Sequence, residues 1–562
     1  MIAAERTRPS EQLKVKSLKE LQEFGIQNFA SMEYRTEVMR RVSKAHGAQK
    51  AILFDDMADA ASPNQREGAH RYERHLLPGL ITATGFPEGA AVVVAALPAS
   101  SELKYVGAYK QKLEEELGRS INYEMLYAQG DKIVDLMKLD QKDYKKLQQD
   151  TFANPDTYIR HGSQSVVIKE LILPNLAPLQ KTLLIPYQTT YEHYAEFANE
   201  IMANRVALPD VHEVDKAYNG LLLQEHGFKH LPKMHIIGSD GSTFKTHEQL
   251  EEAGKEAPTF KTPDLVNQLA GSITTVMDEL AEEGMNAYVK LDPSGASGRG
   301  NLDPGNYPKL YDPTVDTQIK QTIVAEAIQE MPGMHLPFQV IVEEFVEARE
   351  VEGIPVDVTV CGEMIDGVFL PISVNPFGIT NGSYDREWTG PNAEAIRDNV
   401  EDWEEMFRVY MDIGDVLAKN GYRNGVLAGD LFQREDGTFA QHDYNLRRGG
   451  RSVPESITAL EPEGWFDGSI QISLTEASVS PGKIINAYHQ ICERLVEQGV
   501  LPYATGLAYG DNREPSNVRT FKILRKMESL VDEDNNPLPR DQHLAYTEAM
   551  LLNVAESLAA TN

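Results

Sequence analysis

The chain has 562 residues, a formal net charge of −31 and an apolar content of 41%. This length is too great for one hydrophobic core and predicts about three or four domains or subdomains. The negative charge argues against binding to a nucleic-acid backbone, two cysteines are too few for a disulfide framework or a cysteine-based metal site, and no apolar run is long enough to span a membrane. We therefore expect a cytoplasmic protein without nucleic-acid or membrane partners.

Strands alternate with helices over the first 195 residues. The expected strands cover residues 51–54, 90–96, 122–128 and 183–186, and the expected helices cover most of 1–45, 105–117 and 133–147. This alternation predicts the α/β fold class, with a parallel sheet. The GxGxxG dinucleotide fingerprint is missing, so a nicotinamide role is not supported.

A second unit is expected to begin near residue 208. Helices over 191–201 and 216–226 precede a strand over 232–238, and the strand 288–291 carries Lys290. The loop after Lys290 is rich in small residues, namely Ser294, Gly295, Ser297, Gly298 and Gly300. Such residues let backbone N–H groups approach an anion closely. A glycine-rich surface loop explains them equally well, because no Gly-Lys-Ser/Thr sequence closes the loop as in a Walker A motif.

The next stretch predicts a helix over 315–330 and a strand over 338–342 that runs into Glu343-Glu344-Phe345-Val346. An extended segment there would offer backbone N–H and C=O groups to an adenine edge. Phe345 is explained equally well as a core residue. A hairpin around Cys361-Gly362-Glu363 is expected to join strands over 356–360 and 368–372.

Residues 425–451, GVLAGDLFQREDGTFAQHDYNLRRGGR, predict a hairpin. Strand-like runs over 426–432 and 438–446 flank Asp436-Gly437, which is the signal of a two-residue type I′ turn. In the register of that turn, Glu435 faces Thr438 and Arg434 faces Phe439. Asp430 then lies directly opposite Asp443.

Two opposed carboxylates destabilise a hairpin unless a cation lies between them. One face of the second strand carries Gln441, Asp443, Asn445 and Arg447, and Asp430 points the same way, whereas His442 faces away. Oxygen ligands suit a hard cation such as Mg²⁺, and Mn²⁺ is an alternative. A cation held by so few carboxylates takes its remaining ligands from phosphates and water. The plain alternative is a solvated hairpin with acidic residues on its wet face. Asn445 and Arg447 favour the ion.

The end of the chain is predicted to be mostly helical. Helices are expected over 403–420, 484–498 and 543–559, and residues 502–519 show no clear pattern.

Taken in order, these motifs resemble the ATP-grasp superfamily over about residues 205–455. The matching features are Lys216, the lysine and small-residue loop at 290–301, the hinge at 343–346, and the hairpin with Asp430 and its acid-x-Asn-x-Arg strand. The run DYNLRRGG is most similar to carboxylate–amine ligases of the pheganomycin peptide-ligase type. The resemblance implies a Rossmann-like pre-ATP-grasp domain (1–195), a two-subdomain ATP-grasp domain of α+β type (196–455, with a lid at about 230–345) and a helical C-terminal extension (456–562).

The resemblance also implies roles for single residues. Lys216 and Lys290 would neutralise ATP phosphates, the hinge would bind adenine through backbone groups of Glu343 and Val346, and the small-residue loop would close as a lid. Either Glu350 or Glu352 would hold the ribose.

The resemblance implies that the hairpin residues bind the metal ion and the transferring phosphoryl group. Asp430, Asp443 and Asn445 would hold Mg²⁺, and Arg447 would stabilise charge on the transferring phosphoryl group. The family usually has Glu where this chain has Asp443, which leaves the choice between one and two metal ions open.

The implied reaction activates a carboxylate as an acyl-phosphate and joins it to an amine, releasing ADP and phosphate. The expected substrates are small-molecule or peptide carboxylates and amines, and a homodimer is kept as an open option. Two alternatives remain: an ATP-grasp kinase that leaves the phosphoryl group on its acceptor, and a nucleotide-binding protein without catalysis.

Overall fold

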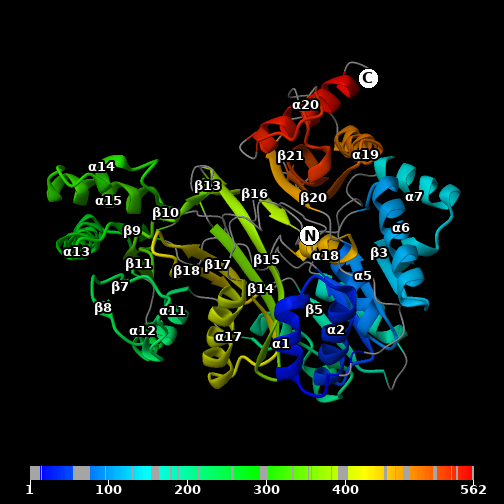
Figure 1. Cartoon of the computed structure of the whole chain (residues 1–562), viewed down its shortest axis with the longest axis horizontal. Helices are drawn as coiled ribbons and strands as arrows, with labels where there is room; N and C mark the ends of the chain where they lie inside the picture. The colour runs from blue at the N-terminus through cyan, green and yellow to red at the C-terminus, as the bar shows by residue number, and fades with distance from the viewer. Residues whose placement is uncertain are drawn as a thin grey trace.

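The computed structural model describes residues 13, 15–54, 76–94, 97–129, 131–153, 164–176, 180–186, 189–211, 216–254, 259–291, 301–331, 334–351, 354–355, 357–380, 383–389, 403–447, 452–461, 464–471, 481–509, 515–532, 534–539 and 542–559. They form a mixed α/β fold around sheets of six, five and eight strands, with one further two-stranded sheet (Figure 1). Within these ranges no helix is long and apolar enough to cross a membrane.

The N-terminal part is built on the six-stranded sheet, in the order β4-β3-β2-β1-β5-β6. Its strands are β1 (Lys50–Phe54), β2 (Ala90–Val94), β3 (Tyr123–Gln129), β4 (Lys132–Asp135), β5 (Thr182–Pro186) and β6 (Val206–Ala207). Neighbours run parallel except at the edge strand β4. Every residue of β1, β2 and β5 is buried, as expected for parallel strands that are covered on both faces.

Helices cover both faces of this sheet. They are α2 (Met32–His46), α5 (Leu76–Gly85), α6 (Ser100–Leu117), η1 (Leu136–Lys138), α7 (Gln141–Ala153), α8 (Gln164–Val167), the π-helical η3 (Ile168–Ile172), η4 (Leu173–Asn175), α9 (Tyr191–Glu196) and α10 (Ala198–Met202). The first helix, α1 (Leu18–Asn28), instead contacts the eight-stranded sheet described below, where Gln22 donates a hydrogen bond to Phe369 O. Leu53 packs in one core with residues of α2, α5 and α6, whereas Ile52 packs in another with Ile168. The predicted parallel α/β layer is confirmed, but the helix predicted over 133–147 is wrong at its start, because residues 132–135 form β4.

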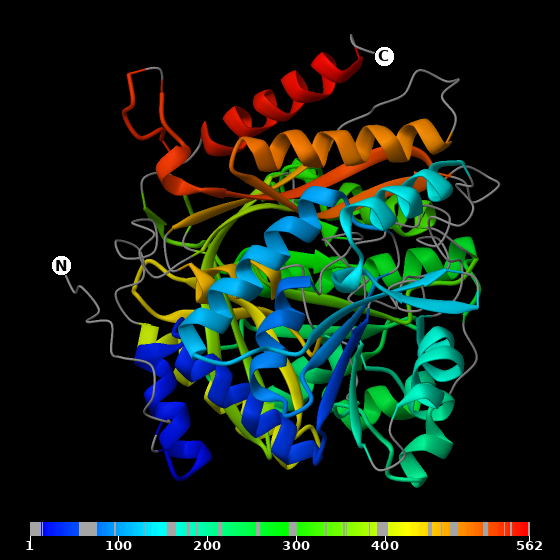
Figure 2. The ribbon, with the colours of Figure 1, turned by 90° about the vertical axis from the view of Figure 1, so that its right-hand side faces the viewer.

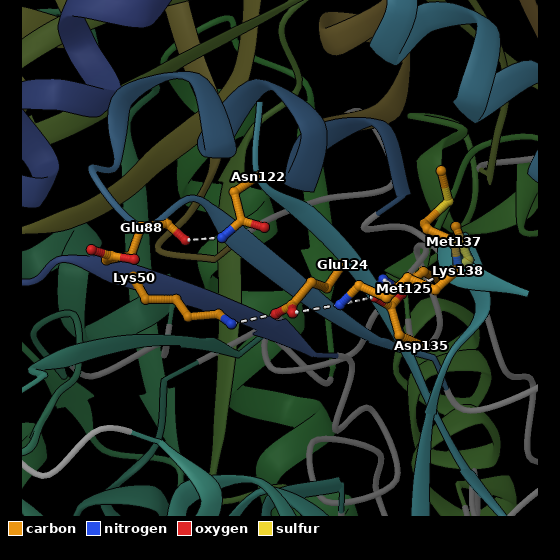
Figure 3. A network of polar contacts seen from close by, with 8 residues as sticks. All are labelled: Lys50, Glu88, Asn122, Glu124, Met125, Asp135, Met137 and Lys138. Carbon is orange, nitrogen blue, oxygen red and sulfur yellow. Dashed lines mark hydrogen bonds and ion pairs between the residues drawn. The ribbon is translucent and has the colours of Figure 1, made fainter. Parts of the chain in front are cut away.

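An ion-pair network joins β1, β3 and β4 (Figure 3). Lys50 pairs with Glu124, and Lys138 contacts Glu124 at 3.5 Å and Asp135 at 2.9 Å. Asp135 also accepts hydrogen bonds from the backbone N–H groups of Met125 and Met137. Burial alone would raise the pKa of Glu124, but the two lysines lower it on balance. The network therefore ties the antiparallel edge strand to the centre of the sheet.

The second sheet lies at the left of Figure 1 and falls in the range 230–345 predicted to be a lid, so it is here called the lid sheet, or lid for short. Its order is β10-β9-β11-β7-β8, all antiparallel, with β7 (Met234–Gly238), β8 (Thr243–Phe244), β9 (Ala287–Lys290), β10 (Asn301–Leu302) and β11 (Gln339–Glu344). The associated helices are α11 (Lys216–Glu225), α12 (His247–Ala253), α13 (Pro263–Glu282), α14 (Pro308–Tyr311) and α15 (Thr317–Glu330). Thr262 caps α13 ahead of Pro263, a favoured way to begin a helix. Helices α13 and α15 pack on one face through Val340 and Val342, and α11 and α12 pack on the other through Ile341.

The third sheet has eight strands in the order β18-β17-β14-β15-β16-β19-β21-β20. They are β14 (Asp357–Ile365), β15 (Val368–Thr380), β16 (Ser383–Thr389), β17 (Gly425–Gln433), β18 (Phe439–Asn445), β19 (Trp465–Gln471), β20 (Val500–Tyr509) and β21 (Pro515–Lys526). The short pair β12 (Glu350–Val351) and β13 (Ile354–Pro355) precedes it. Helix α17 (Trp403–Lys419) packs on one face through Met406, Tyr410, Ile413 and Leu417, which have the spacing of one helix face.

The C-terminal part belongs to this same sheet. Besides α18 (Ser452–Leu460), α19 (Pro481–Glu497), η6 (Met527–Ser529) and α20 (His543–Ala559), it supplies β19, β20 and β21. Figure 2 shows α19 lying along these strands with α20 beyond it. The expectation of a mostly helical extension therefore missed three strands, two of which occupy the stretch without a clear pattern.

Candidate functional site

The strand pairing of β17 and β18 places Asp430 directly opposite Asp443, as predicted. The predicted turn is wrong. Arg434 N–H donates to Thr438 O at 2.8 Å, so Arg434, not Glu435, faces Thr438, and Phe439 pairs with Gln433. The loop has three residues, 435–437, and Gly437 has φ +82° whereas Asp436 is not among the described non-glycine residues with positive φ. A type I′ turn requires positive φ at both central positions.

A bulge restores the predicted pairing of the two acids. The pairing shifts between Asp430 and Leu431, because Leu431 pairs with Gln441 while Asp430 pairs with Asp443. The longer turn shifts the strand register by one residue relative to the prediction. One extra residue of β18 at the bulge shifts the register back, so Asp430 again pairs with Asp443. The prediction that Gln441 shares a face with Asp430 and Asp443 is therefore wrong. Gln441 pairs with Leu431 and lies on the opposite face.

The two faces of the eight-stranded sheet differ sharply in chemistry. Val358, Val360 and Leu431 belong to the apolar core under α17. On the opposite face, successive cross-strand rows hold Asn375–Thr359–Asp430–Asp443, then Ser373–Cys361–Ala428–Asn445, then Leu370–Glu363–Val426. Thr359 Oγ1 donates to Asp430 Oδ1 at 3.0 Å, which orients that carboxylate. This face, here called the polar face, carries the candidate metal ligands.

Asn445 is the last residue of the same strand. It pairs with Ala428, two positions from the Asp430 row. Arg447 lies in a bend two residues beyond the end of β18, so the predicted strand, which extends to Leu446, is one residue too long. The structure describes only the backbone of His442 and Asp443. Among the described side chains, no group of three or more His, Cys, Asp or Glu could hold a metal ion. Two Asp positions and one Asn still form an all-oxygen donor set that suits Mg²⁺ once phosphates and water complete its shell.

The lid sheet presents a second polar face. Lys290 Nζ lies 2.7 Å from Glu343 Oε1, and both side chains are at most 5% exposed. Tyr288 and Asn301 share this face with them, according to the register. The ring of Tyr288 stacks on Phe345 with centroids 6.0 Å apart. The predicted strand lysine and hinge glutamate are therefore in direct contact.

Helix α11 begins at the predicted Lys216 and packs on this same lid face. Ala217 and Leu221 belong to one apolar cluster with Ile341, the neighbour of Lys290 in the strand register. The helix is followed by Gly227, which has φ +69° as expected for a glycine stop. The structure thus brings the first turn of α11 to the sheet face that carries the second predicted lysine.

The hinge ties the lid to the hairpin. Glu344 pairs with Arg434 at 3.2 Å, and Arg349 N–H donates to Gln433 O at 2.7 Å. Gln441 N–H donates to the backbone oxygen of His230, just before β7, at 2.7 Å. Two strands of the hairpin are therefore bonded to the two segments that enter and leave the lid.

The hinge backbone is partly engaged within the protein. Glu344 N–H donates to Lys233 O and Phe345 N–H donates to Asn286 O, both at 2.7 Å. Val346 follows them in the described chain. Several predicted nucleotide-binding residues lie outside the described ranges, namely Ser294, Gly295, Ser297, Gly298, Gly300 and Glu352, and Glu350 is described only as backbone of β12.

Sequence reasoning missed a second buried polar cluster on the polar face. Ser373 Oγ donates to Glu455 Oε1 at 3.0 Å, and Arg35 Nη2 donates to Ile372 O at 2.6 Å. Burial raises the pKa of the Cys361 thiol well above its ordinary value, and Glu455 and Glu363 raise it further. The sequence signal that locates the hairpin between β14 and β15 is the pair Asp366-Gly367, in which both residues have positive φ. The hairpin closes at Asp366-Gly367 and not around residues 361–363 as predicted. With the turn at 366–367, residues 359, 361 and 363 belong to one strand, and its alternation puts Thr359, Cys361 and Glu363 on one face.

Two small cavities adjoin Glu363. One, of about 30 Å³, is lined by residues of α2, β5, β14 and β17 together with Leu446 and Arg447. The other, of about 40 Å³, is lined by Arg35, Cys361 and Glu455 among others. Glu363 and Val426 line both.

Comparison with known proteins gives only distant likenesses. No protein-family model matches the chain, and no curated protein sequence matches it. The Aspergillus clavatus N5-carboxyaminoimidazole synthase in complex with ADP and 5-aminoimidazole ribonucleotide is 10% identical, with a TM-score of 0.40 over 91% of this chain and 100% of that chain. The Thermotoga maritima phosphoribosylamine–glycine ligase is 12% identical, with a TM-score of 0.39 over 89% and 96%. The Bacillus licheniformis L-amino acid ligase is 10% identical, with a TM-score of 0.37 over 90% and 98%.

Proposed function

We propose that the chain is an ATP-dependent ligase of the ATP-grasp type, which activates a carboxylate as an acyl-phosphate and joins it to an amine. The observation that carries the proposal is the pairing of Asp430 with Asp443 on the polar face, where Thr359 orients the first carboxylate. A second polar face with the buried Lys290–Glu343 pair lies on the lid that the hinge bonds to the same hairpin. These residues are the ones that carry the sequence resemblance, and their contacts support the proposal.

Each part has a physical task in phosphoryl transfer, which needs positioning and charge neutralisation more than covalent chemistry by the protein. Asp430, Asp443 and Asn445 would hold Mg²⁺, or Mn²⁺, which when bound neutralises charge on the ATP phosphates. Lys290 and Lys216 would add positive charge from the lid side. Arg447 would contact the transferring phosphoryl group.

The adenine and the ribose are assigned to the hinge. Backbone groups of Glu343 and Val346 would meet the adenine edge, and Glu350 or Glu352 would hold the ribose. The loop with Ser294 and Gly298 would close over the phosphates and keep water from the acyl-phosphate. The run DYNLRRGG, which resembles the pheganomycin-type peptide ligases, supports an amino acid or a peptide as a substrate.

The proposed reaction has two steps. A substrate carboxylate oxygen attacks the γ-phosphorus of ATP, forming the acyl-phosphate and releasing ADP. The amine nitrogen then attacks the acyl carbon, forming the C–N bond, and phosphate leaves with the electron pair of the broken C–O bond while the amine loses a proton.

The test uses the full chain with ATP, Mg²⁺ and pairs of amino acids, short peptides and other small carboxylates and amines. ADP, phosphate and product mass are measured, and hydroxylamine traps any acyl-phosphate as a hydroxamate. We expect ADP and phosphate in equal amounts together with a condensed product. Asp430→Asn should abolish hydroxamate formation, whereas Asp436→Asn, in the exposed turn of the same hairpin, should retain it. A phosphorylated acceptor without free phosphate would identify a kinase, and full activity of Asp430→Asn would reject the metal site.

A further inference from the structure

Asn375 of β15 belongs to the same cross-strand row as the two acids of the candidate metal site. It pairs with Thr359, which pairs with Asp430, which in turn pairs with Asp443. Residues that pair directly across antiparallel strands point to the same face of a sheet. Asn375 therefore lies on the polar face, two strands away from Asp430 and three strands away from Asp443.

The side-chain amide of Asn375 is buried without a hydrogen-bond partner. The residue is only 2% exposed, and its Nδ2 atom has no hydrogen-bond partner among the residues that the structure describes. Its neighbours on the polar face are paired within the chain, because the Thr359 hydroxyl donates to Asp430 and the Ser373 hydroxyl donates to Glu455. An unpaired buried donor costs free energy and indicates a water molecule or a ligand that accepts its hydrogen bond. The partner that suits Asn375 Nδ2 is therefore an acceptor.

The position of Asn375 relative to the lid indicates which substrate supplies that acceptor. The lid is bonded to the hairpin of β17 and β18 through the Glu344–Arg434 ion pair and the hydrogen bond from Gln441 N–H to His230 O. A nucleotide held between lid and hairpin would thus reach the acid row from the side of the hairpin, whereas Asn375 lies on the other side, beyond β14. The attacking and leaving oxygens of a phosphoryl transfer are roughly in line. Asn375 is therefore on the side from which the carboxylate substrate would attack.

The spacing along the row fits a carboxylate between the metal ion and Asn375. Two strand spacings separate Asn375 from Asp430, which is about 10 Å. A magnesium ion lies about 2.1 Å from its oxygen ligands, and an attacking oxygen lies about 3 Å from the atom that it attacks. One phosphoryl group and one carboxylate group therefore span the distance between the two side chains.

We propose that the Asn375 amide binds the carboxylate substrate of the ligase through an N–H···O hydrogen bond. The inference rests on the proposed function, because it assigns the carboxylate side of that reaction. One carboxylate oxygen forms the new bond to the γ-phosphorus while ADP leaves with the electron pair of the broken P–O bond. The other oxygen keeps the hydrogen bond from Asn375 and becomes the carbonyl oxygen of the acyl-phosphate. The same N–H then stabilises the negative charge that develops on this oxygen when the amine attacks.

Two substitutions separate this role from a structural one. Asn375→Leu removes the amide and keeps a side chain of similar size. If the amide were only structural, this variant would replace an unpaired polar group by an apolar one and leave the kinetics unchanged. Asn375→Asp keeps the shape but removes both N–H donors, so it should repel a carboxylate and favour a ligand that donates hydrogen bonds, such as an ammonium ion. Ser373→Ala is the matched control, because Ser373 lies two residues away on the same strand and face and its hydroxyl is bonded within the protein.

The kinetic test follows hydroxamate formation by the full-length protein at saturating Mg²⁺, with the most active carboxylate and with hydroxylamine in excess. Loss of a hydrogen bond to a charged group predicts a KM for the carboxylate about ten- to a hundredfold higher in Asn375→Leu, and Asn375→Asp should raise it further. KM for ATP should stay near the wild-type value in both variants, and Ser373→Ala should change neither KM. An unchanged carboxylate KM in Asn375→Leu, an equal increase in Ser373→Ala, or a lower carboxylate KM in Asn375→Asp would overturn the proposal while the ligase assignment stands.

A binding test needs no turnover. Propionate and propionamide have the same shape, but only propionate is an anion that accepts hydrogen bonds at both of its polar atoms. Ligand-observed NMR of the full-length protein with Mg²⁺ and ADP should show binding of propionate and not of propionamide. Asn375→Asp should lose the propionate binding and Ser373→Ala should keep it. Undiminished propionate binding in Asn375→Asp, or none in the wild-type protein, would overturn the assignment, whether or not any substrate pair yields ADP.

Discussion

The buried pair of Lys290 and Glu343 allows its structural role to be separated from its proposed role in ATP binding. The two side chains are at most 5% exposed and their charged atoms lie 2.7 Å apart. Removing one partner leaves an uncompensated buried charge, which costs about 3–5 kcal/mol. Lys290→Met should therefore destabilise the lid by that amount. Lys290→Met combined with Glu343→Gln should recover most of it, because no buried charge then remains.

The measurement is amide hydrogen exchange of peptides from β9 and β11, since a chain with several sheets need not unfold in two states. Hydroxamate formation with ATP is measured on the same samples. The double variant should regain protection of β9 but stay inactive, because the lysine charge toward the phosphates is still missing. Regained activity in the double variant would refute the phosphate role of Lys290. Wild-type protection in the single variant would refute the reasoning about the buried pair.

Two further predictions concern the eight-stranded sheet. Thr359→Val should remove the 3.0 Å hydrogen bond to Asp430 and cost about 1 kcal/mol of stability; it should raise the Mg²⁺ concentration needed for half-maximal hydroxamate formation, and an unchanged Mg²⁺ dependence would contradict the orienting role. Gly367→Ala should destabilise the protein more than Gly437→Ala, because both glycines have φ +82° but only at Gly367 would a new Cβ meet another atom, Ala418 Cβ at 3.0 Å; denaturant titration of both variants measures the difference, and equal losses would contradict it.

The two Asp-Gly pairs show how far local sequence decides local structure. Both predict a two-residue turn with positive φ at both positions, and Asp366-Gly367 forms one between Ile365 and Val368. Asp436-Gly437 instead closes a three-residue loop in which Asp436 accepts hydrogen bonds from Thr438. The dipeptide therefore predicts a reversal at both positions, but the choice of turn depends on neighbouring contacts.

The predicted opposition of Asp430 and Asp443 is confirmed because two errors cancel. The longer loop shifts the register by one residue and the bulge shifts it back. A bulge has no sequence signature here, so neither shift was predictable from residues 425–451. The alternation of Val358, Thr359, Val360 and Cys361 was visible in the sequence, but it acquires meaning only when β14 is known to pair with β17.

Long-range sheet assembly was least predictable for the same physical reason. The helices within residues 456–562 have clear periodicity and are predicted. The strands there pair with distant partners, because β19 pairs with β16, with Arg386 opposite Gly468, and β21 pairs with β19, with Trp465 opposite Lys526. Pairing partners so distant leave no local pattern. The N-terminal sheet was easier, because buried parallel strands read as continuous apolar runs.

The interface between the N-terminal part and α19 contains two buried groups whose pH effects should oppose each other. Glu102 of α6 accepts a hydrogen bond from Ala99 N–H and lies 3.5 Å from the hydroxyl of Tyr488. Burial raises its pKa from 4.5 to about 7. His489 of α19 contacts Gln148 at 3.0 Å, and burial lowers its pKa from 6.5 to about 3. Both groups are therefore expected to be neutral in the folded protein at mildly acidic pH.

The signs follow from proton linkage. The folded state keeps the Glu102 proton that the unfolded state has lost, so the stability from this group falls by about 1.4 kcal/mol per pH unit as pH rises from 4.5 to 7. The stability from His489 is full above pH 6.5 and falls with the same slope as pH drops toward 3. Between pH 4.5 and 6.5 the two slopes cancel, and the wild-type interface should show little pH dependence from this pair. Glu102→Gln should expose the histidine slope, with a loss of about 3 kcal/mol from pH 6.5 to 4.5, and His489→Gln should expose the opposite slope. Hydrogen exchange of α6 and α19 peptides, corrected for intrinsic rates, measures both, and slopes of the same sign in the two variants would show that these groups do not stay neutral when buried.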